Sequence, residues 1–362
     1  METRCDRGGT GLKLISCMRL SNNTSLYWIL LALTVSGCLP SSCTRIESRD
    51  ITEADSLSRA IAQVMTPDTL TILDVIPAEE NLLVHPRTLG YDPMGVLWVT
   101  DTGNHTLLAF DESGELLSAD TLQGSIPYLA GFSGDSVYVY SPLDHSVYVR
   151  SSTGISGPIE LEGDFPETAA LSYVVKTPSG FVSKVVAQEF SGYLGVHNSG
   201  GALLERVPLE GPAWRYAGLL RESTGVVYSL AGYRPVLDRL RGGLLDSLIL
   251  VGYDSPMLAR SLQFMRGTTN QPPLLMASAS IAGDFMFVLN MRPGWLNIDV
   301  YNLEGRLQFI LTQPDPSFSP DFYPSDIAVR RWGSDGFEIA VAMTKFQPRI
   351  ERYRWVPPAR GM

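Results

Sequence analysis

Short runs of alternating apolar and polar residues, separated by turns rich in glycine and aspartate, make up the chain from residue 85 onward. Such alternation predicts β-strands, and the β-branched and aromatic residues in these runs favour strands further. One run recurs six times, and each copy starts at a glycine or an aspartate. The six starts are Gly95, Asp135, Gly180, Gly225, Asp284 and Gly336. Their spacing of 40 to 59 residues matches the length of one four-stranded propeller blade.

A second glycine follows each of the first five starts at an interval of 18 to 21 residues. These glycines are Gly114, Gly154, Gly200, Gly243 and Gly305. We expect each in the hairpin between the third and fourth strands of a blade, where a positive φ is needed. Two markers in the same phase predict an all-β fold, a six-bladed β-propeller of four-stranded antiparallel blades.

The sixth repeat lacks a fourth strand, because only one further strand, near 349–356, follows the Gly336 run. Residues 69–76 have a strand pattern but belong to no blade of their own. A ring left open would expose two sheet edges, which are templates for aggregation. We therefore expect residues 69–76 to complete the last blade as its outer strand and so close the ring.

The N-terminal region contains an apolar run at 26–35, preceded by Arg19 and followed by small residues. A bilayer crossing needs about 20 apolar residues, so this run of about ten favours a secretory signal. It ends in Val-Ser-Gly-Cys at 35–38, which resembles the lipobox of bacterial lipoproteins. The resemblance implies that residues 1–38 are a signal peptide and that Cys38 carries the lipid. The alternative is an ordinary signal peptide with an unmodified cysteine.

Two further expectations follow for this region. Translation could begin at Met18 instead of Met1, since Met18 to Cys38 is a normal signal length. Leu39 follows Cys38, and by resemblance to Gram-negative lipoproteins this implies the outer membrane, facing the periplasm or the cell surface. The membrane is then a partner of the protein through the lipid.

Residues 39–66 form a polar tether between the anchor and the strands. A cap-like sequence at 52–55 precedes Leu57, Ile61 and Val64, which recur on one face of a helix. A short helix and an unstructured spacer both fit this pattern. The expected organisation is a signal peptide at 1–38, the tether at 39–66, the propeller at 67–358 and a tail at 359–362.

Composition narrows the class of protein without naming a chemistry. Hydrophobic residues make up 44% and charged residues 18%, which is typical of a globular domain. The net charge of −10 argues against nucleic acid as a partner. No cysteine follows Cys43, so disulfides and thiolate metal sites are excluded from the expected propeller.

The first repeat, residues 85–114, resembles an NHL repeat through its Gly-Val-Leu-Trp-Val-Thr-Asp-Thr-Gly-Asn-His core. Residues 300–307 echo the closing half of that motif, whereas the third and fourth repeats lack the Asp-x-x-Asn turn. The chain is therefore similar to the six-bladed, NHL-repeat-like propeller lipoproteins of bacterial envelopes. This resemblance implies a fold and a location, and it implies no particular reaction.

The turns after the second strand of the first two repeats hold polar residues in register, 40 residues apart. The candidates are Asp101, Asn104, His105, Asp144 and His145. They could line a ligand patch on one face. Alternatively, they stabilise their own turns, because Asp and Asn bond nearby backbone and tolerate strained φ.

A second group of candidates lies where the inner strands begin, around the central channel. Arg87 and Arg215 could hold a carboxylate or phosphate there, and the turn residues Arg234 and Arg292 could add positive charge. Pairing of these arginines with nearby carboxylates is the alternative. Asp326 is the one carboxylate expected at these points, too few oxygen ligands for Ca²⁺.

Common nucleophile, zinc and phosphate-loop motifs are absent from the sequence. We therefore assign no catalytic residue, no metal ligand and no cofactor. The expected function is a lipid-anchored, monomeric binding platform for an envelope protein or a small ligand. The alternative is a propeller hydrolase, lactonase or lyase with a metal in the central channel.

Overall fold

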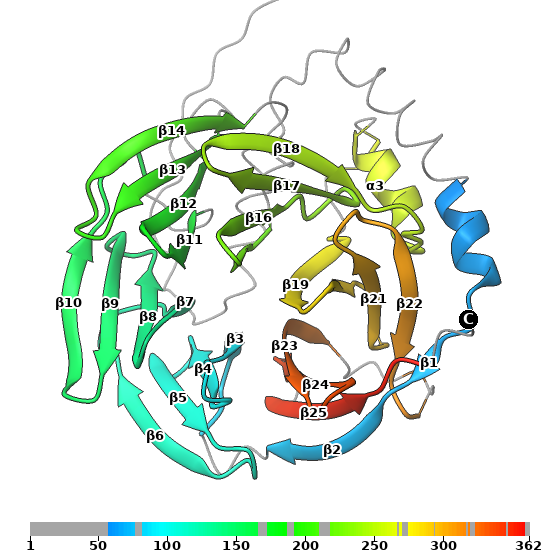
Figure 1. Ribbon diagram of the computed structural model, residues 1–362, viewed down its shortest axis with the longest axis horizontal. Helices are drawn as coiled ribbons and strands as arrows, with labels where there is room; N and C mark the ends of the chain where they lie inside the picture. The colour runs from blue at the N-terminus through cyan, green and yellow to red at the C-terminus, as the bar shows by residue number, and fades with distance from the viewer. Residues whose placement is uncertain are drawn as a thin grey trace, which may run out of the picture.

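The computed structural model describes residues 57–358, except for 77–81, 166–171, 187–191, 210–217, 266–267, 270–273, 293, 316–317, 319–322 and 345–346. Six four-stranded antiparallel blades surround one axis (Figure 1). Blade 1 contains β3 (Pro86–Tyr91), β4 (Leu97–Asp101), β5 (Thr106–Phe110) and β6 (Leu116–Thr121). Blade 2 contains β7 (Tyr128–Ser133), β8 (Ser136–Ser141), β9 (Ser146–Ser151) and β10 (Gly154–Glu160). Blade 3 contains β11 (Ser172–Thr177), β12 (Gly180–Val186), β13 (Gly192–Asn198) and β14 (Leu203–Leu209).

The second half of the ring repeats this order. Blade 4 contains β15 (Leu220–Ser223), β16 (Val226–Leu230), β17 (Val236–Arg241) and β18 (Leu244–Ile249). Blade 5 contains β19 (Met276–Ala282), β20 (Phe285–Asn290), β21 (Asn297–Asn302) and β22 (Leu307–Thr312). Blade 6 contains β23 (Pro324–Trp332), β24 (Gly336–Met343), β25 (Arg349–Trp355) and β2 (Thr71–Ile76). The all-β, six-bladed fold predicted from the two markers is confirmed.

Each recurrent sequence run forms the second strand of its blade, and the second glycine lies in the hairpin before the fourth strand. Four of these glycines have positive φ, between 78° and 110°. In blade 3 the prediction is one residue off, because Gly201 has the positive φ of 92°. The hairpins of blades 1 and 3 have the same register, with Phe110 opposite Leu116 and His197 opposite Leu203, so the position equivalent to Gly114 is Gly201 and not Gly200.

The N-terminal strand lies on the outside of the last blade. β2 pairs antiparallel with β25, with Ile76 opposite Ile350 and Thr71 opposite Arg354. The preceding β1 (Asp68–Thr69) pairs in parallel with β22 of blade 5, so the expected single strand is broken at Leu70. The side chain of Leu70 is buried in the core between blades 5 and 6.

Apolar side chains fill the spaces between neighbouring blades rather than one central core. The core between blades 5 and 6 is the most aromatic: Phe285, Phe309, Phe337 and Trp355 meet with ring centroids 5.0 to 6.4 Å apart. Burial of such rings is favourable in proportion to the apolar area removed from water. The last blade and its N-terminal strand are therefore held to blade 5 by packing.

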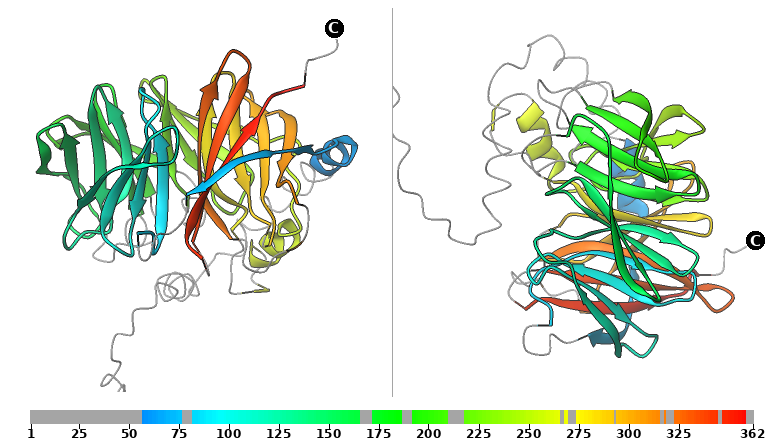
Figure 2. Two further views of the ribbon diagram at one scale, coloured as in Figure 1. Left: turned by 90° about the horizontal axis from the view of Figure 1, so that it is seen from below. Right: turned by 90° about the vertical axis from the view of Figure 1, so that its left-hand side faces the viewer.

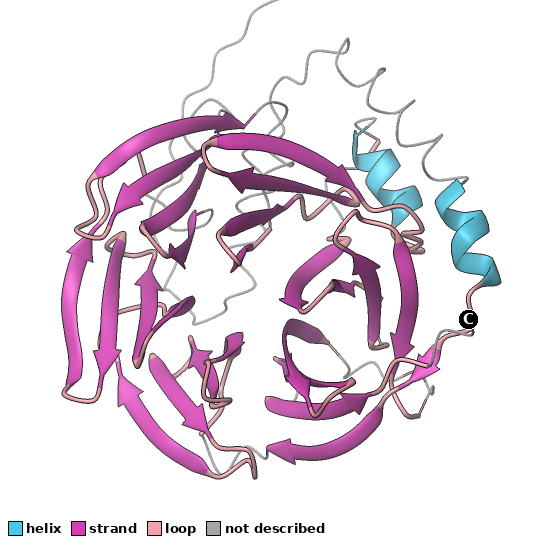
Figure 3. Ribbon diagram, viewed as in Figure 1, coloured by secondary structure: helices cyan, strands magenta, loops and turns pink. Residues whose placement is uncertain are grey.

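Two short helices accompany the strands in the described part of the chain (Figures 2 and 3). Residues 57–64 are helical, and α3 (Leu258–Met265) lies in the connection between blades 4 and 5. The first helix packs on the rim through Ser58, whose hydroxyl accepts a hydrogen bond from the Gly252 N–H at 3.1 Å.

The apolar face expected for residues 57–64 is wrong in part. Leu57 and Val64 are 57% and 81% exposed, whereas Ser58 and Ile61 face the ring. The helix meets an already closed rim at a few side chains only. Neither described helix is long and apolar enough to cross a membrane.

The inner strands of neighbouring blades run in the same direction. Ser278 and Ser280 of β19 accept hydrogen bonds from the backbone of Ile327 and Val329 of β23 at 3.5 and 3.0 Å. All six inner strands therefore begin on one face of the ring, which also carries the turns between second and third strands and the connections between blades. We call it the entry face. Residues at the starts of the inner strands converge there around the axis.

Candidate functional site

Three residues from consecutive blades meet at the axis on the entry face. Arg87 is the second residue of β3, Tyr128 the first of β7 and Tyr173 the second of β11. The guanidinium carbon of Arg87 lies 5.7 Å from the centre of the Tyr128 ring. The Tyr128 and Tyr173 rings are 6.0 Å apart in an edge-to-face arrangement of 76°. All three side chains are half-buried, so water reaches the cluster. We call Arg87, Tyr128 and Tyr173 the entry cluster.

Burial and charge shape the ionisation of this cluster. Burial opposes the charge of Arg87, but the nearby Tyr128 and Tyr173 phenols and the Asp326 carboxylate hold its pKa above the usual range. Burial raises the pKa of Tyr173 to about 12, against the opposing effect of the Arg87 cation. At neutral pH Arg87 therefore keeps its charge and the Tyr173 phenol is neutral.

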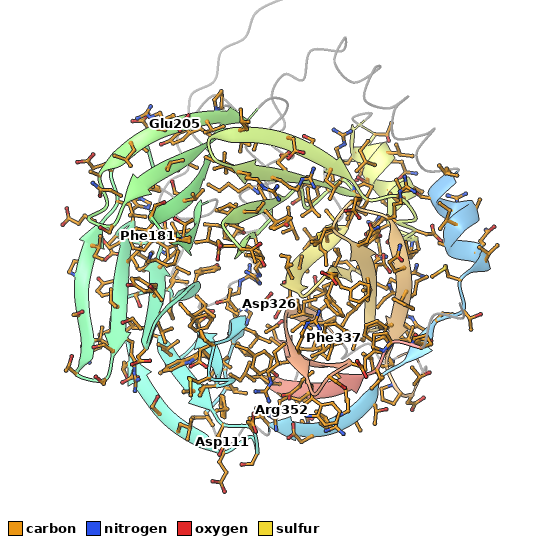
Figure 4. The ribbon with its side chains drawn as sticks, in the orientation of Figure 1. Asp111, Phe181, Glu205, Asp326, Phe337 and Arg352 are labelled. Atoms are coloured by element: carbon orange, nitrogen blue, oxygen red, sulfur yellow. The ribbon has the colours of Figure 1, made fainter. Side chains whose placement is uncertain are left out.

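Asp326 lies near the centre of the ring (Figure 4) and is close enough to Arg87 to affect its pKa, but its carboxylate already has hydrogen-bond partners in the protein. It is fully buried, and its Oδ2 accepts a hydrogen bond from the Leu89 N–H at 2.7 Å. Its Oδ1 accepts hydrogen bonds from the Ser278 hydroxyl and from Arg221 Nη2. The carboxylate therefore joins inner strands of blades 1, 4, 5 and 6 across the axis.

The Arg221 guanidinium is likewise hydrogen-bonded to groups of the protein. Its Nε donates to the Ala279 carbonyl at 2.8 Å, and Nη1 donates to the Leu220 carbonyl at 3.2 Å. The next residue, Glu222, is not a counter-charge at this point, because its carboxylate accepts the Gly225 N–H in the following hairpin. Two guanidinium groups thus face one carboxylate at the starts of the inner strands.

The histidine nearest to this region adds no further charge. Burial and the adjacent Arg87 lower the pKa of His85, against a smaller opposing effect of Asp101. His85 is therefore neutral at neutral pH. Among the described residues at this point, the balance is one excess positive charge.

The turn candidate Asp101 stabilises its own turn. It is fully buried, and its carboxylate accepts the N–H groups of Val84 and His85 at 2.7 and 2.9 Å. It also accepts the N–H groups of Gly103 and Asn104 at 2.8 and 2.9 Å. These bonds use the carboxylate to join the turn to the strand that enters the blade.

The remaining turn candidates do not converge. His105 and His145 have φ of 56° and 53°, a left-handed conformation repeated in both turns. His105 contacts the Ser125 carbonyl, whereas His145 stacks on Phe165 with centroids 4.5 Å apart. Asp144 is exposed and accepts the Tyr148 hydroxyl at 2.6 Å. Asn104 donates to the Leu82 carbonyl at 3.3 Å.

The turn arginines Arg234 and Arg292 follow the second strands of blades 4 and 5. Arg292 donates to the Asp254 carbonyl at 2.8 Å, in the turn after β20. Arg234 is half-buried in the turn after β16. Among the predicted site residues that the structure describes, Arg87 and Asp326 come close enough at the axis for their charges to interact. Cys38 and Arg215 lie outside the described residues.

Sequence reasoning missed Arg221, Tyr128, Tyr173 and Ser278. The inner strand of blade 4 has only four residues and begins at Leu220, so the arginine at its start is Arg221. Its position could have been found by counting back from the hairpin at Gly225. Tyr128 and Tyr173 resemble ordinary strand residues, and only the ring places them beside Arg87.

Within the described residues, no group of three or more His, Cys, Asp or Glu side chains is placed to hold a metal ion.

No protein-family model matches the chain, and no curated protein matches it. Solved structures do resemble it. A catalytically inactive virginiamycin B lyase from Staphylococcus aureus with quinupristin has a TM-score of 0.51 at 12% identity, covering 79% of this chain and 99% of that one. A streptogramin B lyase has a TM-score of 0.50 at 12% identity, covering 79% and 87%. At such identities the likeness shows the fold alone, and the class of this protein is a six-bladed β-propeller.

Proposed function

We propose that this protein is a non-catalytic binding propeller that takes up a small anionic ligand at the entry cluster. The observation that carries the proposal is the charge balance among the described residues at the starts of the inner strands, with Arg87 and Arg221 against Asp326. A buried or half-buried charge without a partner is costly, so an anion supplied by a ligand stabilises the site. Rigid propellers present such sites from their loops and strand ends.

The same contacts favour binding over catalysis. A general base needs a carboxylate or imidazole with a free lone pair near the reacting atom. Asp326 accepts three hydrogen bonds from the protein, and Asp101 accepts four, so both carboxylates serve structure. Among the described residues, the hydrogen-bond partners of the Arg87 guanidinium are phenols and not a carboxylate, so it is the group suited to a ligand.

The test is ligand binding by the full chain with Arg87 altered. Purified protein is incubated with a soluble envelope extract, washed, and analysed for retained small molecules by native mass spectrometry. We expect Arg87→Gln to lose a retained anion and Arg206→Gln to keep it, since Arg206 pairs with Asp164 at an exposed site on β14. Retention of the same compounds by Arg87→Gln would refute the site. A stoichiometric metal in the purified protein would favour the metal-dependent hydrolase or lyase instead.

The proposal includes a lipid anchor at Cys38 in the bacterial envelope. The resemblance of residues 35–38 to a lipobox supports it. The helix at 57–64 packs on the rim near Gly252, so an anchor would leave the ring beside blades 4 and 5. We expect Cys38→Ser to move the protein from the membrane fraction to the soluble fraction. A variant that stays in the membrane fraction would contradict the anchor without affecting the ligand site.

A further inference from the structure

Resting on the proposed binding role, we infer that the ligand of the entry cluster is a monoanionic carboxylate attached to an aromatic or similarly planar body. Arg87 binds the carboxylate, and the rings of Tyr128 and Tyr173 contact the planar body. The inference rests on charge, on the geometry of the rings and on which donors remain available.

The charges around the axis favour a ligand with one negative charge over a ligand with two. Among the described residues around the axis, Arg87 and Arg221 are cations, Asp326 is an anion, and His85 and Tyr173 are neutral. One carboxylate brings this sum to zero. A phosphate dianion would leave one net negative charge in a half-buried site, which again costs free energy.

The guanidinium N–H groups that remain available favour Arg87 over Arg221 as the residue that binds the ligand. Arg221 directs its nitrogens to the Ala279 and Leu220 carbonyls, to Ser278 and to Asp326. Arg87 instead hydrogen-bonds the Tyr128 and Tyr173 phenols, and a guanidinium has five donors in a planar fork, so donors remain for a ligand. A fork of this kind binds a carboxylate through two parallel hydrogen bonds.

The rings of Tyr128 and Tyr173 favour a ligand with a planar body. Tyr128 and Tyr173 stand edge to face beside the guanidinium, and Tyr173 is close enough to Tyr233 to affect its ionisation. Tyr233 in turn packs against Phe264 of α3, with centroids 6.2 Å apart. Aromatic rings therefore continue from the axis toward α3. A planar apolar group next to a carboxylate would gain ring contacts that acetate lacks.

The experiment uses fluorinated fragments and ligand-observed ¹⁹F NMR on the full-length Cys38→Ser protein. The probes are 4-fluorobenzoate, neutral 4-fluorobenzamide and cationic 4-fluorobenzylamine, which share one shape and differ in charge. We expect the benzoate alone to broaden, and acetate to compete much more weakly than unlabelled benzoate. Inorganic phosphate should compete no better than acetate.

Variants place the binding at the entry cluster. Arg87→Gln should weaken benzoate binding by roughly 10- to 100-fold, the usual effect of one charge-assisted hydrogen-bond pair. Tyr128→Phe keeps the ring and should retain most binding, and Arg206→Gln should retain all of it. Equal melting temperatures would show that Arg87→Gln is folded.

The outcomes separate this inference from the proposed function. Stronger competition by phosphate, or binding of the amide or amine, would overturn the carboxylate class while leaving a ligand site at Arg87. Benzoate binding unaffected by Arg87→Gln would overturn the inference as well. No retained extract compound dependent on Arg87 would instead overturn the proposed function itself.

Discussion

Some single residues in this ring have environments that cannot be predicted from their neighbours in the sequence. Lys184 of β12 is fully buried, and its ammonium donates to the Gly218 and Leu230 carbonyls of blade 4 at 3.0 and 2.8 Å. Burial lowers its pKa to about 7, although Asp238 opposes the shift. The lysine joins two blades through hydrogen bonds that do not require its charge.

Replacing Lys184 by Met should change the pH dependence of stability. Between about pH 7 and 10 the unfolded chain still holds a proton that the folded lysine has released. The unfolding free energy of the unaltered protein should therefore rise with pH in that window, by at most about 1.4 kcal/mol per pH unit. The difference between Lys184→Met and the unaltered protein, measured by urea unfolding, should show this slope. A difference that does not vary with pH would contradict the buried, neutral lysine.

At the scale of elements, the seam between the first and last blades depends on the N-terminal strand and one arginine. Arg352 of β25 is 2% exposed and binds Asp74 of β2 through Nε and Nη2. It also donates to the backbone carbonyls of Asp111 and Glu112 in the outer hairpin of blade 1. One guanidinium thus connects the incoming strand, the last blade and the first blade.

Asp74→Ala should destabilise this seam because it leaves the buried Arg352 without its main partner. We expect a loss of about 1–3 kcal/mol, less than for a fully buried pair because Asp74 is partly exposed. Asp164→Ala is the control, since it breaks the exposed Arg206–Asp164 pair and should cost much less than Asp74→Ala. Chemical denaturation measures both. Equal losses would argue against a special role of Arg352.

Deletion of residues 67–76 tests the strand itself. The deleted chain should melt at a lower temperature and less cooperatively, because β25 and the aromatic core with Leu70 lose their cover. Calorimetry would detect the change. An unaltered transition would refute closure by this strand as a source of stability.

The element boundaries show which parts of the fold could be predicted from the sequence and which could not. The second strand of every blade and the glycine hairpins were predictable, because alternation and positive φ are local requirements. The short inner strand of blade 4 was not predictable, since its length follows from packing around the axis. Arg221, rather than Arg215, consequently stands at the start of that inner strand.

At the scale of the whole molecule, Asp326 links strands that are far apart in the chain. Its partners Leu89, Arg221 and Ser278 come from three other blades, separated from it by 237, 105 and 48 residues. Blades 1 and 5 flank blade 6, and the bond to Leu89 of the first blade exists only when the ring is closed. The Asp326 carboxylate thus contributes to ring closure and also lies close to the entry cluster.

Asp326→Ala should lower the stability of the entire ring. The change leaves Arg221 and the Leu89 N–H without their acceptor, and breaking a buried ion pair costs about 3–5 kcal/mol. A loss of this size should shift the whole melting transition in calorimetry. A loss of unfolding free energy below about 1 kcal/mol would show that water replaces the carboxylate. The contacts of Asp326 would then be dispensable for stability.

The sequence by itself determined the strands, the number of blades and the hairpin positions, because these depend on alternation and backbone conformation within a few residues. It also carried the signal for an anchor at Cys38. Tertiary structure decided the site. Arg87, Tyr128, Tyr173, Arg221 and Asp326 come from five blades and meet only because parallel inner strands bring their first residues to one end of the axis. Charge balance depends on that three-dimensional proximity, and no local pattern encodes it.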